Sequence, residues 1–168
     1  MTDAAPAPIR VASVAADPRV PTESTGRELL ERLNASLGEL NRRMGIRLTR
    51  AGRDRVDGSM PVAGNRQPAG LLHGGANVVL AETLGSMHAM VLAPPGTIPV
   101  GIEVSCSHHR SVTDGEVLGV CVPVQTGRTL AGFEIVITDP TGRRTATARL
   151  TCLYRPVSDG NSGSPALP

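Results

Sequence analysis

The segment from Gly70 to Ser86, GLLHGGANVVLAETLGS, constrains the fold of this chain more than any other. It predicts a helix over residues 74–91 that begins at a His-Gly-Gly turn and ends before Pro94. Alanine, valine, leucine, glycine and methionine occupy nearly every face, and a helix of that kind is buried on all sides. Its single carboxylate, Glu82, is costly to bury without a partner, so we expect a structural or chemical role for it.

After this helix the chain changes to the two-residue period of β-strands. Apolar residues alternate with polar ones at Val100, Ile102, Val104 and Cys106, at Phe133, Ile135 and Ile137, and at Ala146, Ala148, Leu150, Cys152 and Tyr154. Residues 116–124 form a nearly continuous apolar run, and residues 46–50 and 55–62 are typical of a short hairpin. Long strands joined by short turns imply an antiparallel sheet, and wrapping that sheet around the helix is the simplest way to bury it. We therefore predict an α+β fold.

A leucine-rich segment precedes the sheet. One helix, starting at a cap on Ser24 and ending at Gly45, is predicted by the helical spacing of Leu30, Leu33, Leu37, Leu40 and Met44. Residues 1–24 and 156–168 show no period, so we expect them to be flexible tails. Between the tails we predict a single domain, residues 25–155, with this helix as an N-terminal addition.

Composition and charge exclude several classes of function. A net charge of +2, one Phe, one Tyr and no Trp provide neither a basic surface nor a stacking platform for nucleic acid. No apolar run reaches the roughly 18 residues of a transmembrane helix, and the first residues, MTDAAPAPIR, lack the apolar core of a signal peptide. Three cysteines in strand-like segments predict free thiols and a cytoplasmic protein. We therefore expect neither nucleic acid nor membrane as a partner.

The histidines raise the question of a metal site. The chain has four, His73, His88, His108 and His109. Their spacing matches no standard ligand pattern, and adjacent histidines on a strand point to opposite faces. We expect no metal and no other cofactor.

The start and the middle of the long helix offer two groups that one reaction can use. Backbone N–H groups at a helix N-terminus, here at Gly74, favour developing negative charge. A carboxylate such as Glu82 can attack an acyl group or activate water. Thioester hydrolysis needs these two things, a stabilised carbonyl oxygen and an activated oxygen nucleophile.

These residues resemble the hotdog-fold thioesterases, in particular the glutamate-bearing class of the 4-hydroxybenzoyl-CoA and enterobactin-proofreading type, which is PaaI-like. The likeness rests on His-Gly-Gly with Glu82 nine residues after His73, on the preceding Gln67, and on the later stretch EVSCSHHRSV. It covers roughly residues 45–155. The resemblance implies a hotdog fold, in which an antiparallel sheet wraps around a long central helix. It also implies hydrolysis of an acyl- or aryl-CoA thioester, or of one bound to a carrier protein, to free acid and thiol.

The resemblance further implies a role for each residue of the site. Glu82 is the nucleophile or the general base that acts on water, and the N–H of Gly74 polarises the thioester carbonyl. Gln67 and His73 help to orient that carbonyl and the loop. Ser86, one turn after Glu82, positions the attacking water or the departing group.

Four further residues are expected to bind the substrate or its CoA arm: Gly75, His109, Arg110 and Arg128. Arg128 belongs to the sequence Thr-Gly-Arg, which is typical of a turn between strands. Because a guanidinium suits phosphate geometry, Arg128 either reaches a CoA phosphate or serves only this turn.

The spacing of Gly74 and Glu82 predicts a site shared between two subunits. Eight residues on one helix span about 12 Å, whereas an acyl carbon must lie within roughly 3–4 Å of both groups. Two antiparallel helices of a symmetric dimer meet this requirement. We expect one chain to contribute Gly74, His73 and Gln67, and its partner to contribute Glu82 and Ser86. The protein is then at least a homodimer, and we expect two such dimers to associate into a dimer of dimers. Gly85 either lets the two helices approach closely or relieves crowding beneath the sheet.

Two other functions stay open at this point. The first is an enoyl-thioester hydratase, in which Glu82 and His73 act together across the dimer. The second is a non-catalytic module that binds or senses acyl-CoA. The sequence does not identify the acyl group.

Overall fold

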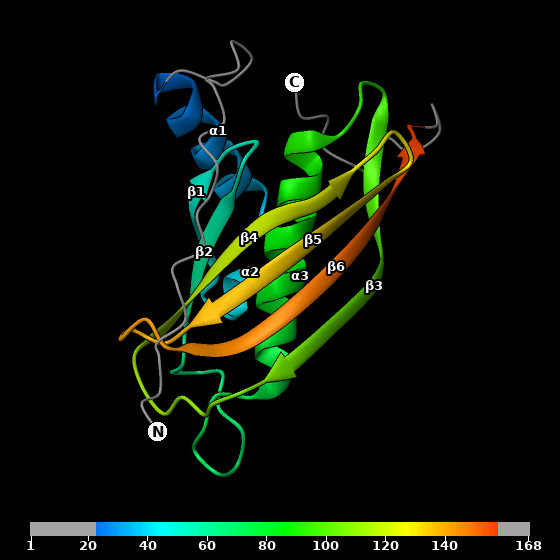
Figure 1. Ribbon diagram of the computed structural model, residues 1–168. Helices are drawn as coiled ribbons and strands as arrows, with labels where there is room; N and C mark the ends of the chain where they lie inside the picture. The colour runs from blue at the N-terminus through cyan, green and yellow to red at the C-terminus, as the bar shows by residue number, and fades with distance from the viewer. Residues whose placement is uncertain (1–22, 158–168) are drawn as a thin grey trace, which may run out of the picture.

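The computed structural model describes residues 23–157, with side chains from residue 26, and the two predicted tails lie almost wholly outside these residues. Its elements are the helices α1 (Glu23–Ser36), α2 (Glu39–Arg43) and α3 (Gly74–Leu92) and the strands β1 (Arg47–Ala51), β2 (Val56–Pro61), β3 (Thr97–His108), β4 (Glu116–Thr126), β5 (Leu130–Thr138) and β6 (Arg144–Pro156). Within the described residues the strands form one antiparallel sheet in the order β1-β2-β4-β5-β6-β3. Figure 1 shows the sheet curving around α3, which confirms the α+β prediction.

The core lies between α3 and the concave face of the sheet. On the neighbouring strands β5 and β6 every second residue points toward the helix and is buried, namely Ala131, Phe133, Ile135 and Ile137 on β5 and Ala146, Ala148, Leu150 and Cys152 on β6. Leu84 of α3 fits so closely that a Cβ on Gly58 of β2 or on Gly119 of β4 would overlap it. The period-two pattern therefore marks the buried face of the sheet.

Gly85 lies on this buried side of α3. A Cβ at this position would overlap the side chain of Leu150 on β6. Of the two roles that the sequence leaves open, relief of crowding beneath the sheet is therefore the observed one. A closer approach of two helices is not, because Gly85 faces its own sheet.

The prediction that α3 is buried on all sides is wrong for the described chain. Glu82 and Gly75 are exposed, and Val79 and Ser86 are half-buried. Residues three and four positions apart share one side of a helix, so these four form a stripe that the sheet does not cover. We call this stripe, Gly75, Val79, Glu82 and Ser86, the open face of α3.

The N-terminal helix predicted between Ser24 and Gly45 is two helices. The first begins at Glu23, one residue before the expected cap, and the second starts after Gly38, whose backbone is extended (φ −66°, ψ 174°). Glycine costs about 1 kcal/mol in a helix interior, so a break there is cheap. No helix in the described range is long and apolar enough to cross a membrane.

The break lets α1 dock on the edge of the sheet. The side chain of Asn34 donates to the carbonyl of Leu48 at 3.0 Å and accepts the N–H of Leu48 at 2.8 Å, as a neighbouring strand would. Leu33 and Leu37 are buried beside this contact. Of the leucines that predicted the N-terminal helix, these two therefore pack against the rest of the same chain.

Strand β3 is the other edge of the sheet, and it is long, with 12 residues. A bulge between Gly101 and Glu103 shifts its register against β6. The bulge reverses which residues of β3 point toward the helix on its N-terminal side. Val100 and Ile102 are therefore 40% and 55% exposed, whereas the two-residue period predicts that both are buried. In the described chain the outer edge of β3 has no paired strand, which leaves a row of backbone groups open to a partner.

Candidate active site

A histidine cap holds the N-terminus of α3. His73 precedes the helix in an extended conformation, and its Nδ1 atom accepts the N–H of Gly75 at 2.9 Å. The His73 carbonyl accepts the N–H of Ala76, also at 2.9 Å. The N–H of Gly74 has no acceptor among the described residues. It therefore remains available to a ligand at the positive end of the helix dipole.

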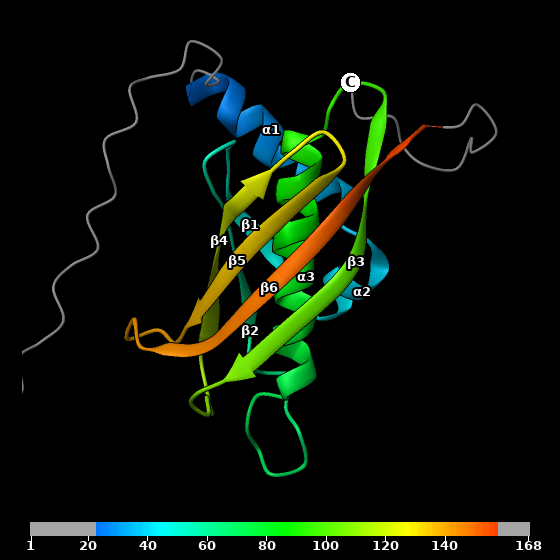
Figure 2. The ribbon, with the colours of Figure 1, turned by 45° about the vertical axis from the view of Figure 1, so that its right-hand side comes forward.

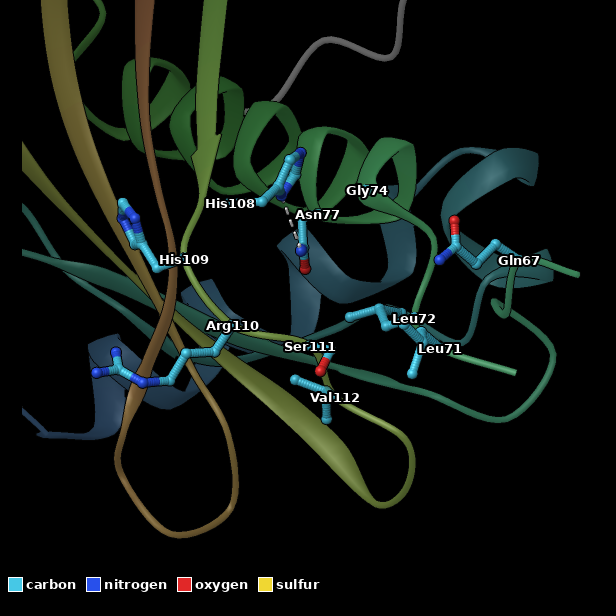
Figure 3. A pocket seen from close by; sticks show the side chains of 10 residues that line it. All are labelled: Gln67, Leu71, Leu72, Gly74, Asn77, His108, His109, Arg110, Ser111 and Val112. Atoms are coloured by element: carbon cyan, nitrogen blue, oxygen red, sulfur yellow. Dashed lines mark hydrogen bonds between the residues drawn. The ribbon is translucent and has the colours of Figure 1, made fainter. Parts of the chain in front are cut away.

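A pocket of about 370 Å³ opens where the start of α3 meets the end of β3. Four residues predicted for the site line it, Gln67, Gly74, His109 and Arg110. The other lining residues are Leu71, Leu72, Asn77, His108, Ser111 and Val112. Figure 3 shows Gln67 on the loop at one side of Gly74, with His109 and Arg110 at the far side, directed away from it. The fold thus gathers residues that lie up to 43 positions apart, from Gln67 to Arg110.

His108 is the main residue of this pocket that the sequence interpretation did not select. Its Nε2 atom lies 3.0 Å from the position that a Cβ on Gly74 would take, and it points toward α3 whereas His109 points away (Figure 3). The available signal was the strand period, since His108 shares a face with Cys106 and Val104. Only the fold shows that this face ends at the start of α3.

Asn77 is the second residue that the sequence interpretation did not select. It is 6% exposed, and its Nδ2 atom lies 3.4 Å from Nδ1 of His108. Its Oδ1 atom is buried with no hydrogen-bond partner among the described residues. A buried polar atom without a partner is costly, so a group that enters the pocket and donates to it would be stabilised.

Glu82 lies on the open face of α3, outside this pocket. Its carboxylate reaches the edge strand, where Oε1 is 3.7 Å from the position of a Cβ on Gly101. It forms no hydrogen bond or ion pair with the described residues. Burial raises the pKa of the neighbouring Cys152 thiol to about 11, and the charge of Glu82 adds to that shift.

The other predicted residues lie apart from the pocket within one chain. His73 and Gly75 form the helix cap, and Ser86 follows Glu82 by one turn on the open face. Arg128 lies in the β4–β5 hairpin, at the opposite end of the sheet from the start of α3 (Figure 1). The structure therefore keeps Glu82 and Ser86 away from the pocket at Gly74 within one chain, as the spacing of Gly74 and Glu82 requires, and it places Arg128 away from both.

The four histidines lie in four different surroundings. His73 caps α3, His88 is buried in the core, His108 lines the pocket, and Nε2 of His109 lies 2.9 Å from Oγ1 of Thr147. Over residues 23–157 no group of three or more His, Cys, Asp or Glu side chains is arranged to hold a metal ion.

Comparison with known proteins places the chain in a family. Residues 69–146 match the model of the thioesterase superfamily. The proofreading thioesterase EntH of Cronobacter turicensis is 51% identical over 124 residues, which cover 73% of this chain and 90% of that protein. This chain belongs to the thioesterase superfamily. The corresponding protein of Cronobacter sakazakii is 50% identical over 124 residues, with the same shares of each chain covered.

Solved structures of thioesterases share the fold of this superfamily member. A mutant of the Pseudomonas aeruginosa thioesterase PA1618 is 37% identical, with a TM-score of 0.73 over 76% of this chain and 94% of that one. The Haemophilus influenzae thioesterase HI1161 is 31% identical, with a TM-score of 0.74 over 78% and 93%. The hotdog fold predicted from the resemblance is therefore confirmed.

Membership in the superfamily identifies the reaction as thioester hydrolysis. This result favours a hydrolase over the hydratase and the non-catalytic module that the sequence left open. A free N–H at a helix start and a carboxylate without a partner among the described residues are the groups that such a hydrolysis needs.

Proposed function

We propose that this thioesterase uses Glu82 to deliver the oxygen nucleophile and the N–H of Gly74 to hold the carbonyl oxygen. The observation that carries the proposal is the exposed carboxylate of Glu82, which has no structural partner among the described residues although it lies mid-helix. A carboxylate with a structural role would be bonded to backbone or to an arginine. The lack of such a partner among the described residues supports a role for Glu82 toward a substrate or a partner subunit.

The chemistry proceeds through attack on the thioester carbon. Glu82 either takes a proton from water as the water oxygen attacks, or attacks with its own oxygen to form an anhydride that water then opens. The carbonyl oxygen becomes negative and accepts the Gly74 N–H, which the helix dipole reinforces. Collapse of this adduct re-forms the carbonyl and breaks the carbon–sulfur bond. In the first route the departing thiolate takes the proton that Glu82 removed from water, and in the anhydride route it takes a proton from the water that opens the anhydride. Gln67 helps to orient the carbonyl.

The proposed site is built from two chains. Glu82 and the pocket at Gly74 are about 12 Å apart along α3, so a second subunit has to bring them together. The open edge of β3 and the open face of α3 adjoin at Glu82 and Gly101, which supports a homodimer in which these two surfaces meet their copies. In that dimer Gly74, His73 and Gln67 of one chain complement Glu82 and Ser86 of the other.

An antiparallel dimer also gives Arg128 a role. The β4–β5 hairpin lies at the end of the sheet away from the start of α3 (Figure 2). In the proposed dimer, a two-fold axis that reverses α3 brings the partner's pocket to that end. Arg128 then binds the CoA or carrier arm of a substrate held by the partner, together with Gly75, His109 and Arg110.

Two further parts of the proposal concern assembly and location. Leu118, Val122 and Leu130 are exposed on the convex face of the sheet, which supports association of two dimers. All three cysteines, Cys106, Cys121 and Cys152, are free, which supports a cytoplasmic location.

The first experiment is thiol release from a panel of benzoyl-, 4-hydroxybenzoyl-, phenylacetyl-, hexanoyl- and palmitoyl-CoA. Glu82→Ala and Glu82→Gln should lower kcat roughly 10²–10⁴-fold without changing the circular dichroism spectrum. Glu39→Gln is the control, because Glu39 is exposed on α2 and pairs with Arg43 on the same helix. Full activity of Glu82→Ala would end this mechanism.

A further inference from the structure

Asn77 lines the pocket at Gly74 and carries a buried polar atom, Oδ1, without a hydrogen-bond partner among the described residues. It lies on α3, three residues after Gly74, and is 6% exposed. Over residues 23–157 the other such atom is Oγ of Ser59, on β2 and outside the pocket. Because a buried acceptor without a donor is costly, its presence in a substrate pocket requires a physical explanation.

The two polar atoms of the Asn77 amide have different surroundings. Nδ2 lies 3.4 Å from Nδ1 of His108, at the end of β3, whereas Oδ1 has no partner within the described part of the chain. Figure 3 shows the nitrogen next to the His108 ring and the oxygen pointing away from it, on the side of Leu72 and Ser111. The contact with His108 therefore holds Oδ1 as an acceptor that is directed into the pocket.

Two other polar side chains of the pocket already have partners elsewhere. Nη1 of Arg110 donates to the carbonyl of Arg144 at 2.9 Å. Nε2 of His109 lies 2.9 Å from Oγ1 of Thr147. Both contacts are directed away from Asn77, so the donor that Oδ1 lacks is one that a bound substrate can supply.

The spacing of Asn77 from Gly74 limits which group of a thioester can be this donor. Three residues rise about 4.5 Å along a helix, so Asn77 lies nearly one turn from the N–H of Gly74. In a pantetheine thioester, whether of CoA or of a carrier protein, the donor nearest to the sulfur is an amide N–H. Four bonds separate its nitrogen from the thioester carbon, which is about the length of one helical turn.

We propose that Asn77 is a specificity-determining residue, whose Oδ1 atom accepts the amide N–H nearest to the sulfur of the substrate while the thioester oxygen lies at the N–H of Gly74. The inference rests on the proposed function and concerns the same pocket. The hydrogen bond forms only with a thiol arm that carries this amide. A site with a buried polar group strongly rejects an analogue that lacks the matching donor, because the group is then left unpaired.

The test compares two benzoyl thioesters as substrates of the full chain, one of N-acetylcysteamine and one of 2-acetoxyethanethiol. Their leaving groups differ only in that an ester oxygen replaces the amide N–H. The wild type should have a kcat/KM for the amide substrate about tenfold or more above that for the ester, because the ester leaves Oδ1 unpaired. In Asn77→Leu the two substrates should become nearly equal, through a loss on the amide substrate.

Two further variants serve as controls. Asn77→Asp keeps an oxygen acceptor at this position, so it should keep a preference for the amide substrate. Thr83→Val changes another buried polar residue of α3, which lies outside the pocket and whose Oγ1 already donates to Oδ1 of Asn41 at 2.7 Å. It should leave the ratio of the two substrates at the wild-type value.

Three results would overturn the assignment. A wild type without a preference for the amide would show that Oδ1 does not recognise it. Equal losses on both substrates in Asn77→Leu would leave Asn77 only the role of supporting His108. If Asn77→Leu instead lost a preference for 4-hydroxybenzoyl over benzoyl thioesters of N-acetylcysteamine, the donor would belong to the acyl group.

Glu82→Ala separates this inference from the proposed function. Full activity of that variant on the amide substrate would defeat the proposed mechanism, and the ratio of amide to ester substrate would still decide the role of Asn77. An inactive Glu82→Ala together with equal losses in Asn77→Leu would defeat this inference alone.

Discussion

The imidazole of His108 lies against the first residue of α3, with Nε2 at 3.0 Å from the position of a Cβ on Gly74. A side chain at position 74 would displace this ring or be displaced by it. Glycine therefore keeps both the N–H of residue 74 and the imidazole of His108 at one end of the pocket. In the proposed mechanism both groups lie beside the carbonyl oxygen on which negative charge develops.

Substitutions of Gly74 should separate the N–H from the space around it. Gly74→Pro removes the N–H and crowds His108 as alanine does, yet it suits the first position of a helix. Loss of the N–H should lower its kcat roughly 10²–10³-fold below that of Gly74→Ala. Gly74→Ala keeps the N–H but crowds His108, so Gly74→Ala combined with His108→Ala should recover part of the activity. Steady-state kinetics measure both effects. Wild-type kcat in Gly74→Pro would show that this N–H is not the oxyanion donor.

A mixture of two inactive variants should regain activity if the site is shared between chains. Glu82→Ala and Gly74→Pro each spoil both sites of their own homodimer. A heterodimer concentrates both defects in one site and leaves the other intact, so an equal mixture that re-forms dimers at random should show about a quarter of wild-type activity. Co-expression with two affinity tags and an activity assay provide the measurement. No gain over the separate variants would place the whole site within one chain.

Packing beneath the sheet should make Gly85 intolerant of a methyl group. Gly85→Ala forces Leu150 to move within a filled core, and overpacking of this kind costs about 1–3 kcal/mol of unfolding free energy. Gly132→Ala on β5 is the control, because a Cβ there meets nothing within 4 Å. Urea denaturation compares the two. Equal stability of both variants would contradict the close contact between Gly85 and Leu150.

Buried His88 should make stability depend on pH. Burial lowers its pKa, while the carbonyl of Arg53 at 3.0 Å, the carboxylates of Asp54 and Asp57, and Cys121 oppose that shift. The unfolded chain then binds the proton more readily, so the stabilisation is complete above about pH 6.5 and is lost as the pH falls below that value.

Replacing His88 should therefore weaken the pH dependence. His88→Gln removes the titrating group, and its unfolding free energy should fall less than that of the wild type between about pH 7 and pH 5. The His88 contribution cannot exceed about 1.4 kcal/mol per pH unit for one proton. Parallel pH profiles for wild type and His88→Gln would refute the role of burial.

Elements with a strong period were predictable from the residues alone. The helix expected over 74–91 is Gly74–Leu92, and the hairpin expected at 46–50 and 55–62 is β1 and β2. The periodic spacing of apolar and polar residues that marks a helix or a strand lies within one short segment, so it can be recognised directly in the sequence. The break at Leu37 and Gly38 was missed, because it depends on how Leu33 and Asn34 contact the edge of the sheet.

The candidate site shows the same division. Gln67, Gly74, His109 and Arg110 were chosen from the sequence and do line one pocket. The contribution of His108 was missed, because His108 ends strand β3 whereas Gly74 begins helix α3, 34 positions earlier in the chain. Only the tertiary structure brings these two residues together. Roles for Glu82 and Ser86 stay predictions, since both lie on the open face of α3, away from that pocket.

The sequence alone determined the helix, the strand pattern, and the positions of a glycine at the start of the helix and a lone carboxylate in its middle, because these are properties of neighbouring residues. The tertiary structure decided which faces stay open. The bulge at Gly101 and Glu103 turns Val100 outward, the edge position of β3 leaves its backbone unpaired within the described chain, and Glu82 lies beside that edge. Such features arise from how strands pair across the sheet, and pairing between distant segments is not encoded in any local stretch of the chain.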